Sequence, residues 1–296
     1  MIKKTLFFQN PAYLSIKNQQ LVIASKKSGE ITERPVEDIG FVILDHPQIT
    51  LSLSVMQLLA SHNVAVVVCD KKHHPTSMMF HLDTHQVQTQ HFRAQVEAGE
   101  PLKKQLWQQT IKIKIRNQAA VLDVTKGQGE ALRYLAKQVK SGDSTNLEGR
   151  AARYYWPVLF GDDFIRGRFG LPPNSMLNYG YAILRAAVAR ALTGSGLLPT
   201  LGIHHKNKYN AYCLADDIME PYRPYVDMLV YELYESGLGQ DEALSVEVKK
   251  ALLEMLASDV IIGKKKRPLM IALSETTASL ARCFMGKNKR ISYPTL

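Results

Sequence analysis

The stretch DTHQVQTQHF, from Asp83 to Phe92, separates two parts of the chain that differ in the spacing of their apolar residues. The stretch itself is polar and rich in glutamine. Before it, apolar residues alternate with polar ones, as in β-strands; after it, they recur every three or four positions, as in helices. The sequence therefore predicts an α+β protein with a small β-rich N-terminal domain over residues 1–82, a linker over 83–92 and a larger all-α domain over 93–296.

Several segments before the linker have strand character. In YLSIKNQQLVIAS, residues 13–25, apolar side chains alternate on both sides of a polar turn, which predicts a β-hairpin. FVILD at 41–45 and VAVVVCD at 64–70 are apolar runs rich in β-branched residues, and they suit buried strands. SLSVMQLLASHN, between them, has helical spacing and ends at Asn63, which can adopt the left-handed conformation that closes a helix.

The part after the linker has helical spacing in most of its segments. PLKKQLWQQTIKIKIRNQAAVL begins with Pro101, and proline favours the first turn of a helix. Further helices are expected over residues 131–143, 143–161, 174–196, 214–221, 221–237, 245–259 and 267–287.

The composition is typical of a folded protein that binds polyanions. Of the 296 residues, 46% are hydrophobic, and the formal net charge is +10, which favours nucleic acid or acidic membrane surfaces as partners. Three cysteines without CxxC spacing argue against a disulfide framework or a structural zinc site. The N-terminal apolar run is too short for a signal peptide and no segment could span a bilayer, so we expect a soluble, cytoplasmic protein.

The segment DSTNLEGRAARYYW places an acid beside small residues on one helix. Asp143 or Ser144 can cap this helix, and Glu148 then shares a face with Ala151 and Tyr155. Small residues beside a carboxylate leave room for a ligand or for a closely packed helix. A solvated glutamate that pairs with an arginine elsewhere in the fold is the alternative.

A second cluster of polar residues lies in TLGIHHKNKYNAYCLADDIMEPYRP, from Thr200 to Pro224. His204 and His205 are adjacent, so we expect their side chains to diverge and only one of them to face a site. Glu220 lies at the break that Pro221 imposes on the helix. One of these histidines, Glu220 and the distant Glu148 would form a ligand set for Mg²⁺ or Mn²⁺, and the imidazole favours Mn²⁺.

Basic residues surround these candidate ligands. A divalent ion would relieve the repulsion between the carboxylates and could bridge them to phosphate oxygens, while nearby cations hold flanking phosphates. A solvated basic face without a ligand is the alternative. The candidate DNA contacts are Arg150, Arg166, Arg168, Lys206, Lys208, Arg223, Lys264, Lys265 and Lys266.

Three blocks of the sequence together resemble the Cas-one family of CRISPR-associated integrases, and most closely its type II branch. The blocks are LEGRAARYYW around Glu148, NSMLNYGYAILRA at 174–186 and LLPTLGIHHKNKYNAYCLADDIMEPYRP at 197–224. The resemblance implies that Glu148, His205 and Glu220 are the metal ligands and catalytic residues. In the PxxGxxH pattern the histidine is His205, and Asp217 matches an acid that supports the site in relatives.

The resemblance also implies an activity and partners. A protein of this family is a metal-dependent DNA endonuclease and integrase: the 3′-hydroxyl of a captured DNA fragment attacks a phosphodiester at the repeat boundary of a CRISPR array. The family works as homodimers bridged by a small ferredoxin-like Cas-two subunit, and in type II systems the RNA-guided effector nuclease takes part as well. The N-terminal domain would then serve dimerisation and DNA contact, and the helical domain catalysis.

Two other functions remain alternatives at this point. In the first, the protein is a DNA-binding scaffold whose carboxylates are structural, so that substitutions alter stability and no chemistry occurs. In the second, His204, His205 and a carboxylate bind iron in an oxygenase. The adjacency of the histidines and the basic surface argue against the oxygenase.

Overall fold

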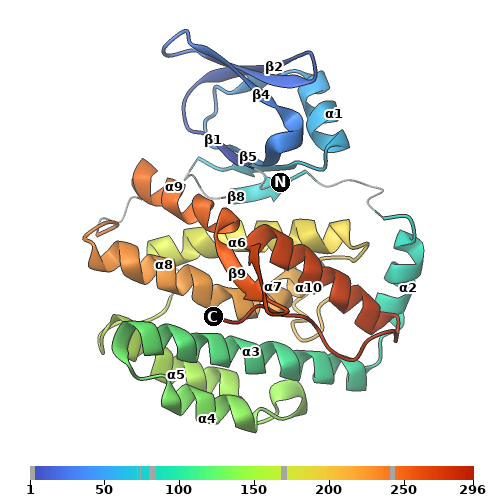
Figure 1. Ribbon diagram of the computed structural model, residues 1–296, viewed down its shortest axis with the longest axis vertical. Helices are drawn as coiled ribbons and strands as arrows, with labels where there is room; N and C mark the ends of the chain where they lie inside the picture. The colour runs from blue at the N-terminus through green and yellow to red at the C-terminus, as the bar shows by residue number, and fades with distance from the viewer. Residues whose placement is uncertain (1–3, 72, 74, 80–84, 168–171, 241–243) are drawn as a thin grey trace. The chain divides into compact units, whose positions relative to one another are not determined.

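The computed structural model describes the chain except residues 1–3, 72, 74, 80–84, 168–171 and 241–243, and it divides into two compact units, Met1–Leu82 and Asp83–Leu296 (Figure 1). This division falls where the change in apolar spacing predicted a boundary. The first unit is rich in strands and the second is helical, which confirms the predicted fold class. The predicted linker is shorter than expected, because helix α2 (Gln88–Glu97) already begins inside it.

The N-terminal unit contains two four-stranded sheets. In the first sheet β1, β5 and β7 run parallel and β8 is antiparallel to β7; in the second, β4, β3 and β2 are antiparallel and β6 is parallel to β2. The strands are β1 (Lys4–Phe8), β2 (Ala12–Lys17), β3 (Gln20–Ser25), β4 (Ile31–Pro35), β5 (Ile39–Leu44), β6 (Thr50–Leu51), β7 (Ala65–Cys69) and β8 (Pro75–Met78), with a short 3-10 helix η1 (Val36–Asp38) and helix α1 (Leu53–Ser61).

The predicted hairpin in the N-terminal unit is strands β2 and β3. Asn18 and Gln19 connect the strands with φ of 50° and 61°, so both occupy the left-handed region that a tight two-residue hairpin turn requires. Because successive side chains of a strand point to opposite faces of the sheet, Leu14 and Leu21 lie on the buried face. These side chains share one apolar core with residues of the other sheet, such as Val42, and with α1. The core therefore lies between the two sheets.

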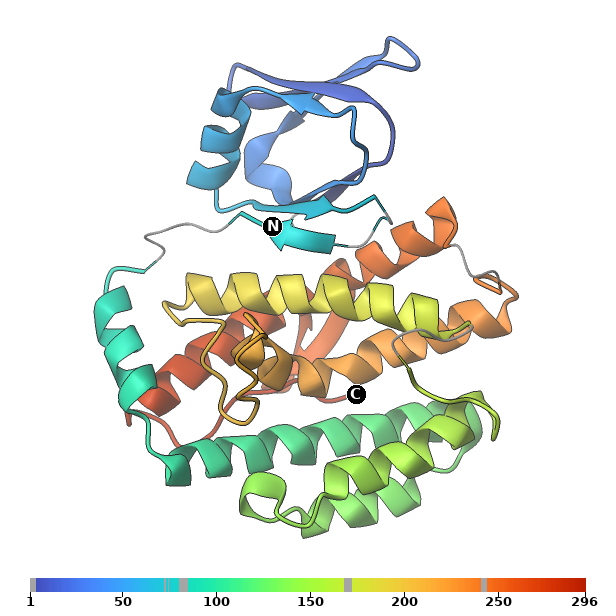
Figure 2. The same cartoon turned by 180° about the vertical axis from the view of Figure 1, so that it is seen from behind.

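The second unit is built mainly from helices around two long ones. Besides α2 they are α3 (Glu100–Lys126), α4 (Glu130–Gln138), α5 (Leu147–Phe160), α6 (Asn174–Gly194), α7 (Cys213–Met219), α8 (Arg223–Glu235), α9 (Val246–Glu254) and α10 (Leu269–Phe284), with 3-10 helices η2 (Ser141–Asp143), η3 (Glu220–Tyr222) and η4 (Met255–Ala257). In the views from both sides, α4 and α5 lie on one side of α3 and α6 lies on the other (Figures 1 and 2). None of the helices that the structure describes is long and apolar enough to cross a membrane.

Helix α3 is the element that connects the two sides of this unit. It begins with Pro101 in its first turn, as predicted, and ends at Gly127, whose φ of 69° closes it. One face buries Trp107, Ile111 and Ile115. The helix contacts α4 and α5 as well as η3 and α8. A side chain in the middle of α3 can therefore reach residues from both sides.

The second unit also contains a two-stranded hairpin, which the expectation of an all-α domain did not include. Strands β9 (Asp259–Ile262) and β10 (Lys265–Pro268) are antiparallel, and Gly263 and Lys264 join them with φ of 56° and 65°. From the sequence, Lys264, Lys265 and Lys266 in this segment were predicted only as candidate DNA contacts. Both turn residues adopt the left-handed conformation, which permits a tight turn. The strand was not predicted because β10 is short and consists mostly of charged residues, without the apolar alternation typical of a strand.

Candidate functional site

Glu148 is held at the start of helix α5. The side chain of Asn146 accepts a hydrogen bond from the Gly149 amide and caps the helix, and the carboxylate of Asp143 accepts from the amides of Leu147 and Glu148 at 2.9 and 3.0 Å. Of the two capping residues that the sequence suggested, Asp143 contacts the first turn, although Asn146 occupies the cap position. These contacts satisfy amides that a helix start leaves free, and they fix the backbone of Glu148.

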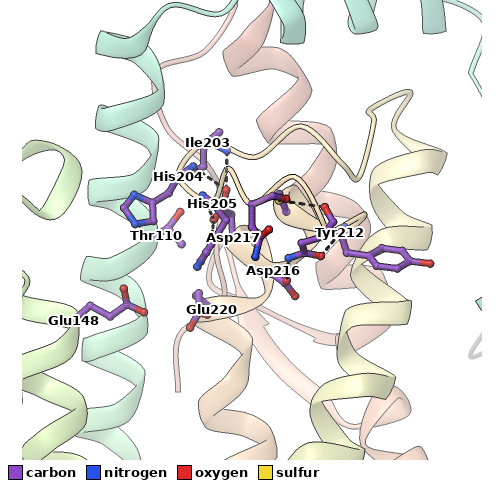
Figure 3. Close-up of polar contacts among 12 residues, drawn as sticks. Thr110, Glu148, Ile203, His204, His205, Tyr212, Asp216, Asp217 and Glu220 are labelled. Carbon is purple, nitrogen blue, oxygen red and sulfur yellow. Dashed lines mark hydrogen bonds and ion pairs between the residues drawn. The ribbon is translucent and has the colours of Figure 1, made fainter. Parts of the chain in front are cut away.

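His205 is fixed by a fully buried acid, Asp217 of α7. The Asp217 carboxylate accepts hydrogen bonds from the backbone amides of Ile203, His204 and His205 at 2.7, 2.9 and 3.2 Å, and its Oδ1 lies 2.5 Å from Nδ1 of His205 (Figure 3). This hydrogen bond is the main reason that the pKa of His205 is raised above its ordinary value. When the imidazole is neutral, Nδ1 carries the proton and Nε2 presents a lone pair.

His204 has a different environment from its neighbour. Its ring stacks on Trp107 with 4.1 Å between centroids and 2° between planes, and it lies at 85° to the ring of His205. Figure 3 shows the two side chains diverging. The expectation that adjacent histidines diverge is therefore confirmed, and of the two imidazole rings it is that of His205 that contacts Asp217.

The side chains of Glu148 and Glu220 meet at a lysine that is not among the site residues predicted from the sequence. Nζ of Lys114, in the middle of α3, lies 2.6 Å from Oε1 of Glu148 and 2.5 Å from Oε2 of Glu220. Oε1 of Glu220 lies 3.0 Å from Nε of Arg223. In Figure 3 the carboxylate of Glu148 points from α5 towards Glu220 and His205. Three distant segments, α3, α5 and η3, thus bring two acids to one ammonium group.

The charges in this cluster stabilise one another. Burial opposes ionisation of Glu220, but Arg223 and then Lys114 outweigh it, so the pKa of Glu220 is lowered. Burial likewise opposes the charge of Lys114, and Glu220 and then Glu148 outweigh it, so the pKa of Lys114 is raised. Glu220 is therefore ionised and Lys114 is protonated at neutral pH.

A second buried acid, Asp227, belongs to a network of side chains that Arg223 also contacts. Asp227 of α8 accepts hydrogen bonds from the hydroxyl groups of Tyr155, at 3.0 Å, and of Tyr181. The guanidinium of Arg223 lies over the Tyr181 ring, 4.5 Å from its centroid. Burial raises the pKa of Asp227 to about 6. This network connects α5, α6 and α8 directly to the arginine that holds Glu220.

The structure brings the three predicted ligands into one region and distributes the predicted DNA contacts widely. Arg223 and Arg166 are engaged inside the protein: Arg223 with Glu220, and Arg166 with Asn174 and Asn178. The exposed residues of the predicted set are Arg150, Lys206, Lys208, Lys264, Lys265 and Lys266, and Arg168 lies outside the described residues. Lys206 pairs with Glu100.

The donor types of this site suit a divalent cation, but the side chains surround a lysine. Two carboxylates and an imidazole with its tautomer set by Asp217 are the ligands expected of Mg²⁺ or Mn²⁺. Among the described residues, no three histidine, cysteine, aspartate or glutamate side chains are arranged so that they could hold a metal ion together. The ammonium of Lys114 lies between Glu148 and Glu220 and supplies the positive charge that these acids require.

Comparison with known proteins identifies relatives for this fold and site. Residues 6–264 match the sequence model of the family described as CRISPR associated protein Cas1. A CRISPR-associated endonuclease Cas1 of Neisseria meningitidis serogroup C (strain 8013) is 36% identical over 299 residues, which cover 100% of this chain and 97% of the relative.

Two solved structures are similar in fold. A casposase bound to integration product superimposes with a TM-score of 0.81 and 22% identity, covering 97% of this chain and 92% of the other. A chain of a Cas6-RT-Cas1–Cas2 complex superimposes with a TM-score of 0.70 and 22% identity, covering 97% of this chain and 35% of the other.

The two-part scaffold, a strand-rich unit followed by a helical one, is the fold that this chain shares with these solved structures. The chain belongs to the CRISPR-associated Cas1 family, which is the Cas-one family that the three sequence blocks resemble.

Proposed function

We propose that this protein is a metal-dependent DNA integrase that inserts short foreign fragments into a CRISPR array by transesterification. The observation that carries the proposal is that Glu148 and Glu220 converge on Lys114 from distant segments and that His205 lies near enough to Glu220 to feel its charge, in a chain of the Cas1 family. The named endonuclease relative and the casposase bound to integration product support DNA strand chemistry as the reaction class.

Each site residue has a definable part in this proposal. Glu148, Glu220 and Nε2 of His205 would hold Mg²⁺ or Mn²⁺, which supplies Lewis-acid stabilisation of charge on the phosphate oxygens. Asp217 orients His205 through Nδ1, and Arg223 holds the second oxygen of Glu220. The backbone around His205 is fixed by three amide hydrogen bonds, so the imidazole enters the site already oriented.

The substrate and partners follow from charge and from the relatives. Exposed lysines and arginines would hold the phosphates of the captured fragment and of the repeat, in keeping with the net charge of +10. The complex that contains Cas1 and Cas2 supports a Cas2 subunit as partner. A homodimer, with the N-terminal unit serving dimerisation, and participation of the effector nuclease complete the proposed assembly.

The test is joining of a labelled short duplex to a supercoiled plasmid that carries a repeat, in the presence of the Cas2 partner. Joining is expected with Mn²⁺ and absent with EDTA. Glu148→Gln, His205→Ala and Glu220→Gln should each reduce it by more than about 100-fold, because even groups that only orient a metal ligand contribute about 10- to 100-fold. Glu130→Gln, a change of an exposed acid on α4, should join at the wild-type rate.

Each variant must first be shown to fold and to bind the duplex. DNA binding without joining, under all metals and with the partner present, would contradict the proposal. The pairing of both acids with Lys114 would then be the structural arrangement of a DNA-binding scaffold.

A further inference from the structure

Lys114 occupies the position between the two acids that the proposed function assigns to a cation. Its Nζ donates a hydrogen bond to Oε1 of Glu148 at 2.6 Å and forms an ion pair with Oε2 of Glu220 at 2.5 Å. The lysine side chain is only 12% exposed, so solvent screens these contacts weakly. This ammonium is an integral part of the site as the structure presents it.

The other carboxylate oxygen of Glu220 also forms an ion pair with a cationic side chain. Arg223 lies 3.0 Å from Oε1, while Lys114 lies 2.5 Å from Oε2. A divalent ion bound to Glu148 and Glu220 would therefore have to share these oxygens with Lys114 or replace it. Like charges within a few ångströms repel strongly in a partly buried site, so replacement is favoured.

Removal of the lysine should have opposite effects on the two states of the site. Without any cation, two partly buried carboxylates would face each other, which destabilises the folded protein. With a divalent ion, the same carboxylates no longer have a competing partner. The side chain thus stabilises the metal-free protein and opposes metal binding through the same two contacts.

We propose that Lys114 is an internal counter-cation that a divalent metal must displace from Glu148 and Glu220, so that metal binding at this site is an exchange of cations. The inference rests on the proposed function, because it takes these acids as metal ligands. Lys114 acts here as a positioning residue: it keeps the acids of α5 and η3 together until the metal replaces it.

The test measures Mn²⁺ binding directly, by the electron paramagnetic resonance signal of free Mn²⁺, on the full chain. Lys114→Met removes the ammonium and keeps an unbranched side chain, and it should bind Mn²⁺ at least about tenfold more tightly than the wild type. Lys112→Met removes the same charge from the same helix and should bind as the wild type does. Lys114→Arg keeps the competing charge, so its affinity should stay at or below the wild-type value.

Thermal unfolding gives an independent measurement. Metal-free Lys114→Met should have a lower Tm than the wild type, and saturating Mn²⁺ should raise its Tm by more than it raises that of the wild type. Adding Glu220→Gln to Lys114→Met should abolish the tighter binding, which locates it at this site. If Lys114→Met does not fold without metal, Mn²⁺ must restore folding; failure to do so overturns the proposal.

Equal or weaker Mn²⁺ binding by Lys114→Met also overturns it. If the wild type binds Mn²⁺ and joins DNA while Lys114→Met binds no more tightly, the proposed integrase function stands and only the exchange is wrong. If neither protein binds Mn²⁺ and DNA is not joined, both the exchange and the metal-dependent function are wrong.

Discussion

At the scale of single residues, Asp217 has two tasks that one carboxylate performs together. It accepts hydrogen bonds from three backbone amides of the loop before α7, and it is also hydrogen-bonded to Nδ1 of His205. A carboxylate is suited to this position because it has acceptor sites on both oxygens and no proton to donate. The position of the histidine and the conformation of its loop therefore depend on the same side chain.

Asp217→Asn tests this double role. The amide nitrogen would meet donors instead of accepting from them, so we expect a loss of about 1–3 kcal/mol in the free energy of unfolding. Mn²⁺ affinity should fall by about 10- to 100-fold, because the partner of a metal ligand is altered. Urea unfolding and Mn²⁺ titration measure the two effects, with Asp162→Asn, an exposed acid, as control. Unchanged stability and affinity would show that Asp217 has neither role.

Asp227 predicts a dependence of stability on pH. Burial raises its pKa from 3.8 to about 6, so the folded protein binds this proton more tightly than the unfolded chain. Its contribution to stability is complete below about pH 4 and is lost as the pH rises through about 6, by about 3 kcal/mol at most. Asp227→Asn replaces the ionisable carboxyl with an amide that does not titrate. The difference in unfolding free energy between wild type and variant should therefore change between about pH 4 and pH 6. A constant difference from pH 4 to 7 would contradict the assignment.

At the scale of the elements, helices α6 and α8 approach closely at a glycine. A Cβ added at Gly180 of α6 would lie 2.5 Å from Cγ1 of Val226 in α8, which is too short for two carbon atoms. Tyr181, the next residue, donates its hydroxyl to Asp227 of α8. The close contact thus helps to keep the tyrosine and the acid within reach of each other.

Gly180→Ala is therefore expected to destabilise the protein although alanine favours helices. Overpacking costs about 1–3 kcal/mol, and helix propensity returns about 1 kcal/mol of it. Gly194→Ala in the same helix meets nothing within 4 Å and should be neutral or slightly stabilising. In a double-mutant cycle measured by urea unfolding, Val226→Ala should relieve part of the cost, with a coupling of about 0.5–3 kcal/mol. Additive effects would show that the two helices do not meet as described.

The elements also show which parts of the site the sequence could predict. Glu148, His205 and Glu220 stand in short blocks with recognisable spacing, so the sequence could single them out as candidates. Lys114 stands in TIKIKIRNQ beside Lys112 and Arg116, and nothing local distinguishes it. Only the packing of α3 against α5 and η3 determines which basic residue meets the acids. The β9–β10 hairpin was missed for a similar reason, since its strands are short and one of them is highly charged.

At the scale of the whole molecule, the net charge of +10 predicts that the proposed DNA binding weakens as salt is added. The position of the charges matters beyond their number, because only cations close to phosphates release counterions on binding. The hairpin of β9 and β10 presents three exposed lysines: Lys264 in its tight turn, and Lys265 and Lys266 on β10. Because the backbone of the hairpin is already ordered, binding through these three charges costs less backbone entropy than binding through a disordered tail.

Changing all three hairpin lysines to glutamine should therefore reduce the salt dependence of DNA binding. Each phosphate contact contributes about 0.9 to the slope of log affinity against log salt, so the slope should fall by up to about 2.7. Fluorescence anisotropy with a short duplex from about 50 to 200 mM salt measures this slope. The matched control changes Lys126, Lys137 and Lys140, which are exposed on and near α3 and α4, and removes the same net charge. If both triple variants alter the slope equally, the hairpin contacts no phosphates of its own and only the overall field of the protein attracts DNA.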